Sequence, residues 1–145
     1  MDNIKGEENE NYLQGFEDLW RQVNEEAWSF TPLADATVRI TAEGVEMTYA
    51  AAPTDDADVF GLAAIIGSVA GLPDEGALCE DALAWNAAHE VTLSLVGDGT
   101  KLRASILGDA RRLDADHLRD AIRQVADTVA AWRDRTNAAT EGGAE

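Results

Sequence analysis

The segment from Val91 to Leu107 constrains the fold more than any other part of this sequence. Apolar and polar residues alternate through it on both sides of the turn Gly97-Asp98-Gly99-Thr100. Alternation with a period of two is typical of a β-hairpin that rests one face on a core and leaves the other to water or a partner. A strand follows the glycines where a dinucleotide-binding loop requires a helix, so this turn predicts no cofactor site. The alternating apolar residues are Val91, Leu93, Leu95, Leu102, Ala104 and Ile106.

Three other segments show the three- and four-residue spacing of amphipathic helices. The first is predicted over residues 10–28, and Pro32 ends its pattern. A short second helix includes Leu78 to Asn86. The third helix runs from Leu118 to Trp132 and follows Asp114, a residue type that commonly caps a helix N-terminus.

The remaining strands are predicted in the first half of the chain. Residues Val38 to Tyr49 alternate around a Glu43-Gly44 turn and indicate a first hairpin. Ala50 to Asp58 is predicted to be a loop. Val59 to Ala70 is an apolar run that fits a buried strand or a buried helix, and its glycines favour a third strand because glycine destabilises a helix interior.

This order of elements predicts an α+β fold. We expect an antiparallel sheet with three helices on one side, in the order α-β-β-β-α-β-β-α. Residues 1–10 are polar and without a period, which predicts a disordered arm. Residues 11–136 are then expected to form a single domain, followed by a loose tail over residues 137–145.

The distribution of charge limits the partners that the chain can bind. The formal net charge is -17, and all of it lies in the first 100 residues, where 20 acidic residues face only Lys5, Arg21 and Arg39. Such a surface repels nucleic acid and anionic membranes, since both are bound through clustered Lys and Arg. It is compatible with a positively charged partner, or with a charge that only maintains solubility.

Cysteine content and hydropathy predict a soluble cytoplasmic protein. Cys79 is the only cysteine, so no internal disulfide can form, and no basic-then-apolar leader begins the sequence. The longest apolar run, Val59 to Leu72, is shorter than the ~20 residues of a membrane-spanning helix.

No motif in the sequence predicts a reaction, so we expect no enzyme, no metal and no cofactor. His89 and His117 lack partners at metal-binding spacing, and Cys79 lies on the apolar side of its helix, where a buried thiol is far commoner than a nucleophile. The aspartates at 55, 56 and 58 lack the glycine turn and the distal glutamate of a calcium loop. Adjacent acidic pairs diverge around a helix and do not form acid/base pairs.

One family does match the second half of the pattern. Residues 78–86 (LCEDALAWN), a strand, the GDG turn at 97–99, a second strand, the helix start LDADHL at 113–118 and a terminal Trp132-Arg133 resemble the class I type III secretion chaperones, the Tir-chaperone family, and the related YbjN-like sensory-transduction regulators. The likeness extends over about residues 10–135. It is carried by hydrophobic spacing, by Asn86 and by the Gly-Asp-Gly turn.

This resemblance implies a small acidic homodimer without enzymatic activity that holds an extended segment of a client protein. By that resemblance, the short helix and second hairpin form the dimer contact, and the first helix and the outer sheet surface hold the client. The dimer candidates are Leu78, Ala82 and Trp85. The candidates for an apolar client groove are Leu13, Phe16, Trp20, Val38, Ile40 and Met47, and each of these could equally be a core residue.

A second function remains open at this point. The family commonly places a Leu-Pro pair between its last strand and last helix, where this chain reads ILGDARR at residues 106–112. A stand-alone YbjN-like regulatory or scaffold protein with the same fold and no secretion client is therefore the alternative.

Overall fold

The computed structural model describes residues 15–33, 37–53 and 58–136. Residues 15–23 form the first helix. It is followed by β1 (Ser29–Pro32), β2 (Thr37–Ala42), β3 (Val45–Pro53), β4 (Asp58–Ser68), α2 (Glu75–Ala88), β5 (Thr92–Val96), β6 (Lys101–Asp109), the 3₁₀ turn η1 (Ala110–Arg112), α3 (Ala115–Trp132) and the 3₁₀ turn η2 (Arg133–Arg135).

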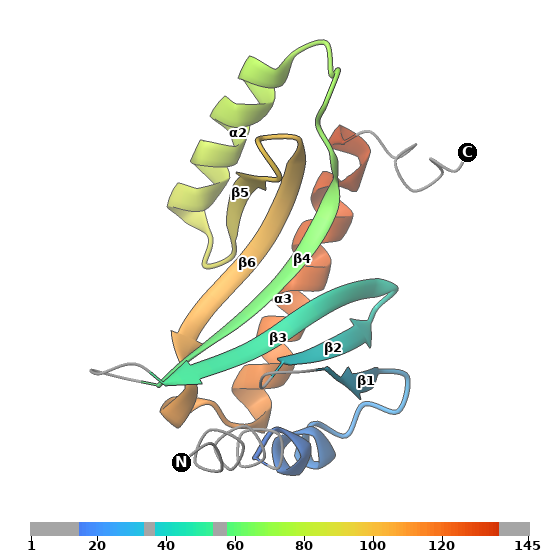
Figure 1. Cartoon of the computed structure of the whole chain (residues 1–145), viewed down its shortest axis with the longest axis vertical. Coiled ribbons are helices and arrows are strands. Elements are labelled where there is room, and N and C mark those ends of the chain that lie inside the picture. Colours follow the sequence, from blue (N-terminus) through green and yellow to red (C-terminus); the bar gives the residue numbers. More distant parts are fainter. Residues whose placement is uncertain (1–14, 34–36, 54–57, 137–145) are drawn as a thin grey trace, which may run out of the picture.

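The six strands form one antiparallel sheet in the order β1-β2-β3-β4-β6-β5. The long strands β3, β4 and β6 are central, and the sheet twists strongly from β5 to β1 (Figure 1). The pairing register shifts between Ile65 and Gly67 of β4, which is a bulge opposite β6. Bulges of this kind increase local twist and bend the strand.

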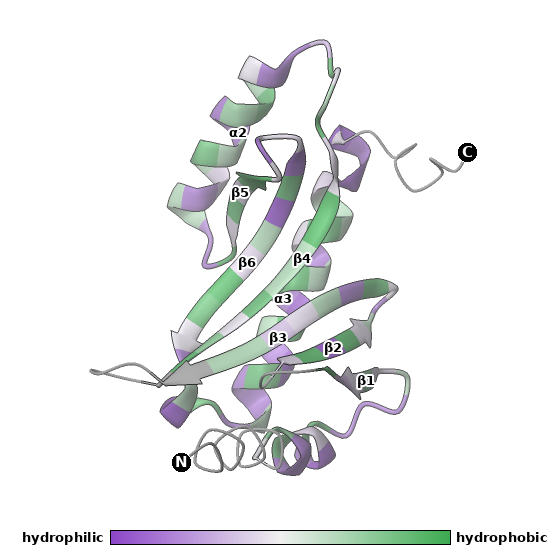
Figure 2. Cartoon of the chain, viewed as in Figure 1, coloured by the Kyte–Doolittle hydropathy of each residue, from purple (hydrophilic) through white to green (hydrophobic). Residues whose placement is uncertain are grey.

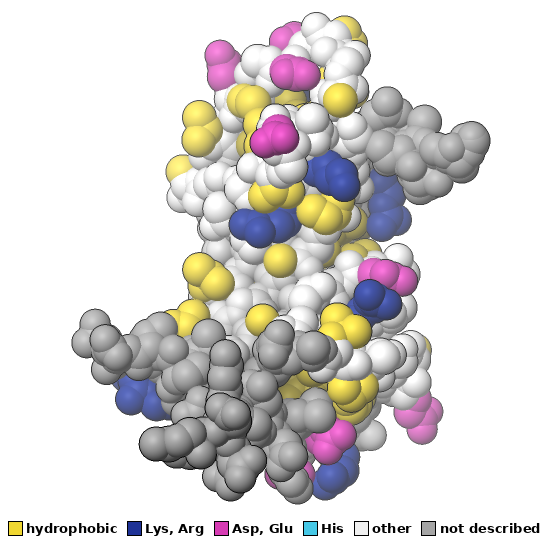
Figure 3. Space-filling model, viewed as in Figure 1, with side chains coloured by type: hydrophobic (Ala, Val, Ile, Leu, Met, Phe, Trp, Pro, Cys, Tyr) yellow, Lys and Arg dark blue, Asp and Glu magenta, His cyan; other side chains and the backbone are white. Residues whose placement is uncertain are grey.

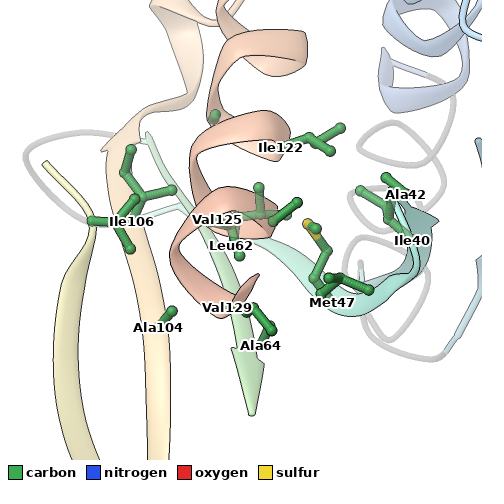
Figure 4. Packing of buried hydrophobic residues seen from close by; sticks show 14 of the residues in the cluster. Ile40, Ala42, Met47, Leu62, Ala64, Ala104, Ile106, Ile122, Val125 and Val129 are labelled. Atoms are coloured by element: carbon green, nitrogen blue, oxygen red, sulfur yellow. The ribbon is translucent and has the colours of Figure 1, made fainter. Parts of the chain in front are cut away.

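Alternate side chains of the strands build the core beneath α3. Ile40, Leu62 and Ala104 are fully buried on this face, and Val125 and Ile122 of α3 lie against the strands (Figure 4). Banding of hydropathy along β6 shows the same alternation that the sequence predicts (Figure 2). The sheet therefore has one buried face, under α3, and a second face on the opposite side.

The first helix is fixed to α3 and to the aromatic core. The Arg119 side chain of α3 donates hydrogen bonds to the Val23 carbonyl oxygen, at 2.8 Å from Nη2 and 3.2 Å from Nε. A cation at this point satisfies a terminal carbonyl and complements the negative end of the helix. Phe16 packs against Tyr49 and Phe30, with ring centroids 4.8 and 5.2 Å apart.

Helix α2 follows the β5 edge (Figure 1), and its Trp85 contacts the last residue of α3. The Trp85 ring stands edge-on to Trp132 at 5.9 Å. The Asn86 side chain accepts a hydrogen bond from the Leu93 amide at 2.7 Å and donates one to the Leu93 carbonyl at 3.0 Å. One amide side chain thus pairs with the backbone of β5 as a neighbouring strand would.

Several sequence predictions are confirmed. The α+β class, the strand over Val59–Ala70, the second hairpin and both later helices are present. The Asp114 carboxylate caps α3 by accepting from the His117 amide at 2.8 Å. The predicted arm (1–10) and tail (137–145) lie outside the described residues.

Other predictions were wrong at the boundaries. Helix was expected to residue 28, but it ends at residue 23, and Asn24 has a positive φ of 55°. A sixth strand, β1, was missed because its four residues are too few to show an alternation. The expected loop from Ala50 is strand up to Pro53, since β3 continues its pairing with β4. None of the helices in the described ranges is long and apolar enough to cross a membrane.

Candidate functional site

The face of the sheet opposite α3 is the main exposed surface of the fold. We call it the outer face and define it by the outward-pointing residues of β2, β3, β4 and β6. Strand register places Arg39, Thr48 and Ala63 side by side across three strands, and Ile65 opposite Arg103. The outer face also includes Glu46, Lys101, Ser105 and Leu107.

A hollow of about 490 Å³ lies in the middle of the outer face. Its outward-pointing lining residues are Arg39, Glu46, Thr48, Ala63, Ile65 and Arg103. Ile65 is 50% exposed, and Leu107, further along β6, is 74% exposed. Hydrophobic and basic side chains lie together in the middle of this view of the molecule (Figure 3). The outer face therefore combines apolar contact area with positive charge.

A second apolar surface lies between α2 and β5. We call it the α2–β5 patch and define it by Cys79, Leu83 and Leu95, over a floor of Leu78, Ala82, Leu93 and Leu102. It encloses about 290 Å³. Leu83 is 69% exposed and Leu95 is 43% exposed. Because β5 is an edge strand of the sheet, this patch lies beside backbone that no described strand covers.

Of the three dimer candidates from the sequence, Leu78 and Ala82 line this patch and Trp85 does not. Leu78 and Ala82 are 3% and 9% exposed and form its floor. Trp85 is half-buried and stacks on His89, with ring centroids 3.7 Å apart. Leu83 and Leu95, which the sequence analysis did not select, are the side chains that project from the surface.

The candidates for a client groove lie mostly in the core. Phe16, Val38, Ile40 and Met47 are at most 2% exposed and pack beneath the sheet. The sequence left open whether these four residues line a groove or belong to the core, and in the described structure they are buried in the core. Trp20 is half-buried against that core. Leu13 lies outside the described residues.

The exposed apolar residues of the outer face were missed for a specific reason. Phe60, Leu62, Ala64 and Ile66 were correctly placed on one face of a strand, and all four are buried. The opposite face of the same strand then includes Ile65. An apolar residue at a position that the alternation assigns to solvent was the signal that could have revealed this surface.

Two carboxylates have perturbed acidity, and both serve local structure. The pKa of Asp109 is lowered, mainly because the Arg111 backbone amide donates a hydrogen bond to it at 2.9 Å. The pKa of Asp114 is lowered for the same reason by the His117 amide. Both groups are solvent-exposed and hold turns or helix ends.

No cluster of three or more His, Cys, Asp or Glu side chains in the described ranges could hold a metal ion. Cys79 is a half-buried free thiol beside the α2–β5 patch. The two surfaces offer apolar area, backbone at a sheet edge and guanidinium groups.

Comparison with solved structures relates this arrangement to known proteins. A chain in the structure of the HopA1–SchA chaperone–effector complex superposes with a TM-score of 0.65 at 14% identity, over 88% of this chain and 96% of that one. A chain of the ExoU–SpcU complex from the type III secretion system of Pseudomonas aeruginosa gives 0.55 at 21% identity, over 68% and 81%. The fold is type III secretion chaperone-like.

The same chaperone-like fold extends to a third structure. YbjN, a putative transcription regulator from E. coli, superposes with a TM-score of 0.52 at 17% identity, over 81% of this chain and 91% of that one. No protein-family model and no curated protein sequence matches the chain. The likeness is therefore one of fold, and it confirms the resemblance seen in residues 78–133.

Proposed function

We propose that this protein is a non-enzymatic binding module that holds an extended segment of a partner protein on the outer face of its sheet. The observation that carries the proposal is the hollow around Ile65, which joins apolar and basic side chains on a broad sheet surface. Extended segments suit such surfaces because their alternate side chains enter shallow apolar sites. The chaperone–effector complexes that share the fold support the same class of function.

We further propose that the protein acts as a homodimer joined through the α2–β5 patch. Leu83 and Leu95 expose apolar area that self-association would bury. A twofold contact places the same patch of each copy against the other, so one self-complementary surface is sufficient. The two outer faces would then be available to one continuous partner segment.

Site-specific photocrosslinking tests the partner site. Benzoylphenylalanine is introduced in place of Ile65, Leu107 or, as a control, Arg21, an exposed residue of the first helix. The cells that naturally produce the protein are irradiated, and the crosslinked peptides are identified by mass spectrometry. We expect positions 65 and 107 to capture the same short segment of one protein and position 21 to capture none. Equal capture from all three positions would contradict the proposal.

The YbjN-like alternative is favoured by the third structural neighbour. A stand-alone regulator or scaffold without a secretion client predicts that crosslinks from Ile65 reach a folded domain rather than an extended segment. Limited proteolysis of the crosslinked partner separates the two readings, since an extended segment is cleaved rapidly when it is released from the complex.

A further inference from the structure

Among the described residues, every Lys or Arg side chain of the helices and turns except Arg133 forms an ion pair, whereas those of the strands form none. In the described part of the chain, Arg119, Arg123 and Arg135 each form an ion pair with a carboxylate, at 2.9, 2.6 and 2.9 Å. Arg21, Arg111 and Arg112 are also paired. The strands contain three basic residues, Arg39, Lys101 and Arg103, and none of them has an ion pair among the described residues.

All three unpaired bases of the strands point to the same side. Arg39 alternates with the buried Val38 and Ile40, so it faces outward from β2. Lys101 and Arg103 flank the buried Leu102 in the same way on β6. The outer face is therefore a positively charged surface on a protein whose net charge is -17.

Arg103 also has hydrogen-bonding capacity that is not used within the chain. Its Nε has no acceptor in the described part of the structure, and the Ser94 hydroxyl, directly across the β5–β6 ladder, has no partner there either. Both of these atoms are buried, so a peptide carboxylate would bind the part of the guanidinium that is not buried, where the charged hydrogen bond adds to the Coulomb attraction.

From this geometry we infer that the outer face recognises an extended peptide segment with the pattern acidic–x–apolar–x–acidic, whose carboxylates bind Arg39 and Arg103. The inference deepens the proposed function and rests on it. Arg39 and Arg103 lie on strands that are three sheet spacings apart, about 14 Å, and Arg103 lies two residues along β6 from Ser105, the position level with Arg39, an offset that the long arginine side chains span. An extended peptide covers that distance in about four residues, and its residues i, i+2 and i+4 share one side.

The apolar position of this pattern falls on apolar surface of the sheet. Ala63 and Ile65 lie on β4, between the strands that carry the two arginines, and both line the hollow. A side chain at i+2 would rest on them while its neighbours at i and i+4 reach the guanidinium groups. Glu46 lies at the β2–β3 end of the hollow. Its negative charge disfavours an additional peptide carboxylate near Arg39.

Charge complementarity selects an acidic peptide over nucleic acid as the occupant. Three bases are few for a polyanion, whose binding depends on many phosphate contacts. The acidic residues elsewhere on the chain would repel a long phosphate backbone. They have little effect on a short segment held at one face, because salt screens charges beyond about 8 Å at physiological ionic strength. A short peptide with two carboxylates matches the number and spacing of the two arginines, Arg39 and Arg103.

Selection from a displayed library of random 12-residue peptides tests the inference on the full-length protein. We expect the enriched peptides to share two acidic residues four positions apart with an apolar residue between them. In fluorescence anisotropy, R39Q and R103Q should each weaken binding of an enriched peptide about 5-fold, and the double variant about 25-fold. Arg21→Gln removes the same charge away from the outer face and should leave affinity unchanged.

The outcomes separate this inference from the proposed function. Peptides that lose binding with Ile65→Glu but bind R39Q/R103Q as tightly as the wild type would refute the acidic pattern and leave the binding face intact. Enriched peptides without acidic residues would likewise refute the acidic pattern and leave the binding face intact. Tighter binding of a 20-nucleotide oligodeoxythymidine than of any peptide would overturn the choice of partner class, and the absence of any enriched peptide would count against both proposals.

Discussion

Leu83 is the residue whose substitution tests the proposed dimer most directly. It is 69% exposed in the monomer, and full burial of a leucine side chain contributes roughly 1.5–3 kcal/mol. Burial of the exposed portion at an interface therefore contributes about 1–2 kcal/mol for each copy. A twofold contact uses the residue twice, so Leu83 contributes about 2–4 kcal/mol to the dimer.

The substitution Leu83→Glu removes this contribution with little effect on the helix, since Glu and Leu have similar helix propensities. The dimer dissociation constant should rise at least about 30-fold, which corresponds to 2 kcal/mol. Sedimentation velocity over a concentration series measures the constant directly. The wild type should approach twice the chain mass of 15.5 kDa at concentrations where the variant is monomeric.

Ala84→Glu is the matched control for this experiment. Ala84 is exposed on the same helix, but it points about 100° away and does not line the α2–β5 patch. The control adds the same charge and should leave the dissociation constant unchanged. If both variants dimerise as the wild type does, or if the wild type is monomeric at all concentrations, the assignment of the interface to this patch is wrong.

Three further predictions concern the stability of the fold that supports these surfaces. Gly108→Ala would place a Cβ 2.6 Å from the Phe60 ring and should cost about 1–3 kcal/mol in urea unfolding, as overpacking does. Asn86→Ala leaves the Leu93 amide and carbonyl without their side-chain partner and should cost about 1–3 kcal/mol. Because the folded pKa of Asp114 is depressed, its carboxylate stabilises the fold above the unfolded pKa, and this contribution is lost as the pH falls through the folded value. Asp114→Asn should therefore lower the melting temperature at pH 7 more than at pH 3.

Each of these predictions has a matched control. Gly15→Ala adds a methyl group in open space on the first helix and should not destabilise the protein. Asn86→Asp keeps an acceptor for the Leu93 amide and should fall between wild type and Asn86→Ala in urea. Asp116→Asn changes an exposed carboxylate next to the cap. Its effect on the melting temperature should not show the difference between pH 7 and pH 3 that Asp114→Asn shows. Equal effects in a variant and its control would contradict the corresponding contact.

The sequence predicts those parts of the fold in which one residue pattern repeats over several turns or strand positions. The second hairpin and α3 are of this kind, because burial on one side imposes a regular spacing. β1 is too short to show such a spacing; it pairs with β2, and its Phe30 packs against Phe16 of the first helix, contacts that no local residue pattern encodes.

The candidate surfaces were less predictable than the fold. In the pair Ile65-Ile66, two identical residues are 50% and 8% exposed, and hydrophobicity alone does not distinguish them; the alternation along β4 does. The groove candidates were chosen for hydrophobicity, which selects core and surface alike. Among the described residues Arg39 forms no ion pair although Glu46 lines the same hollow, and composition does not contain this three-dimensional arrangement.

The Asn86 amide on the backbone of Leu93 also limits how copies of this protein can join. A bare strand at a sheet margin is a template for the addition of further strands, and such growth has no built-in stopping point. Here an incoming strand would have to displace a side chain that already pairs with the backbone of Leu93 in β5. Strand addition is therefore disfavoured at this margin, and in the proposed dimer the two copies would meet through side chains.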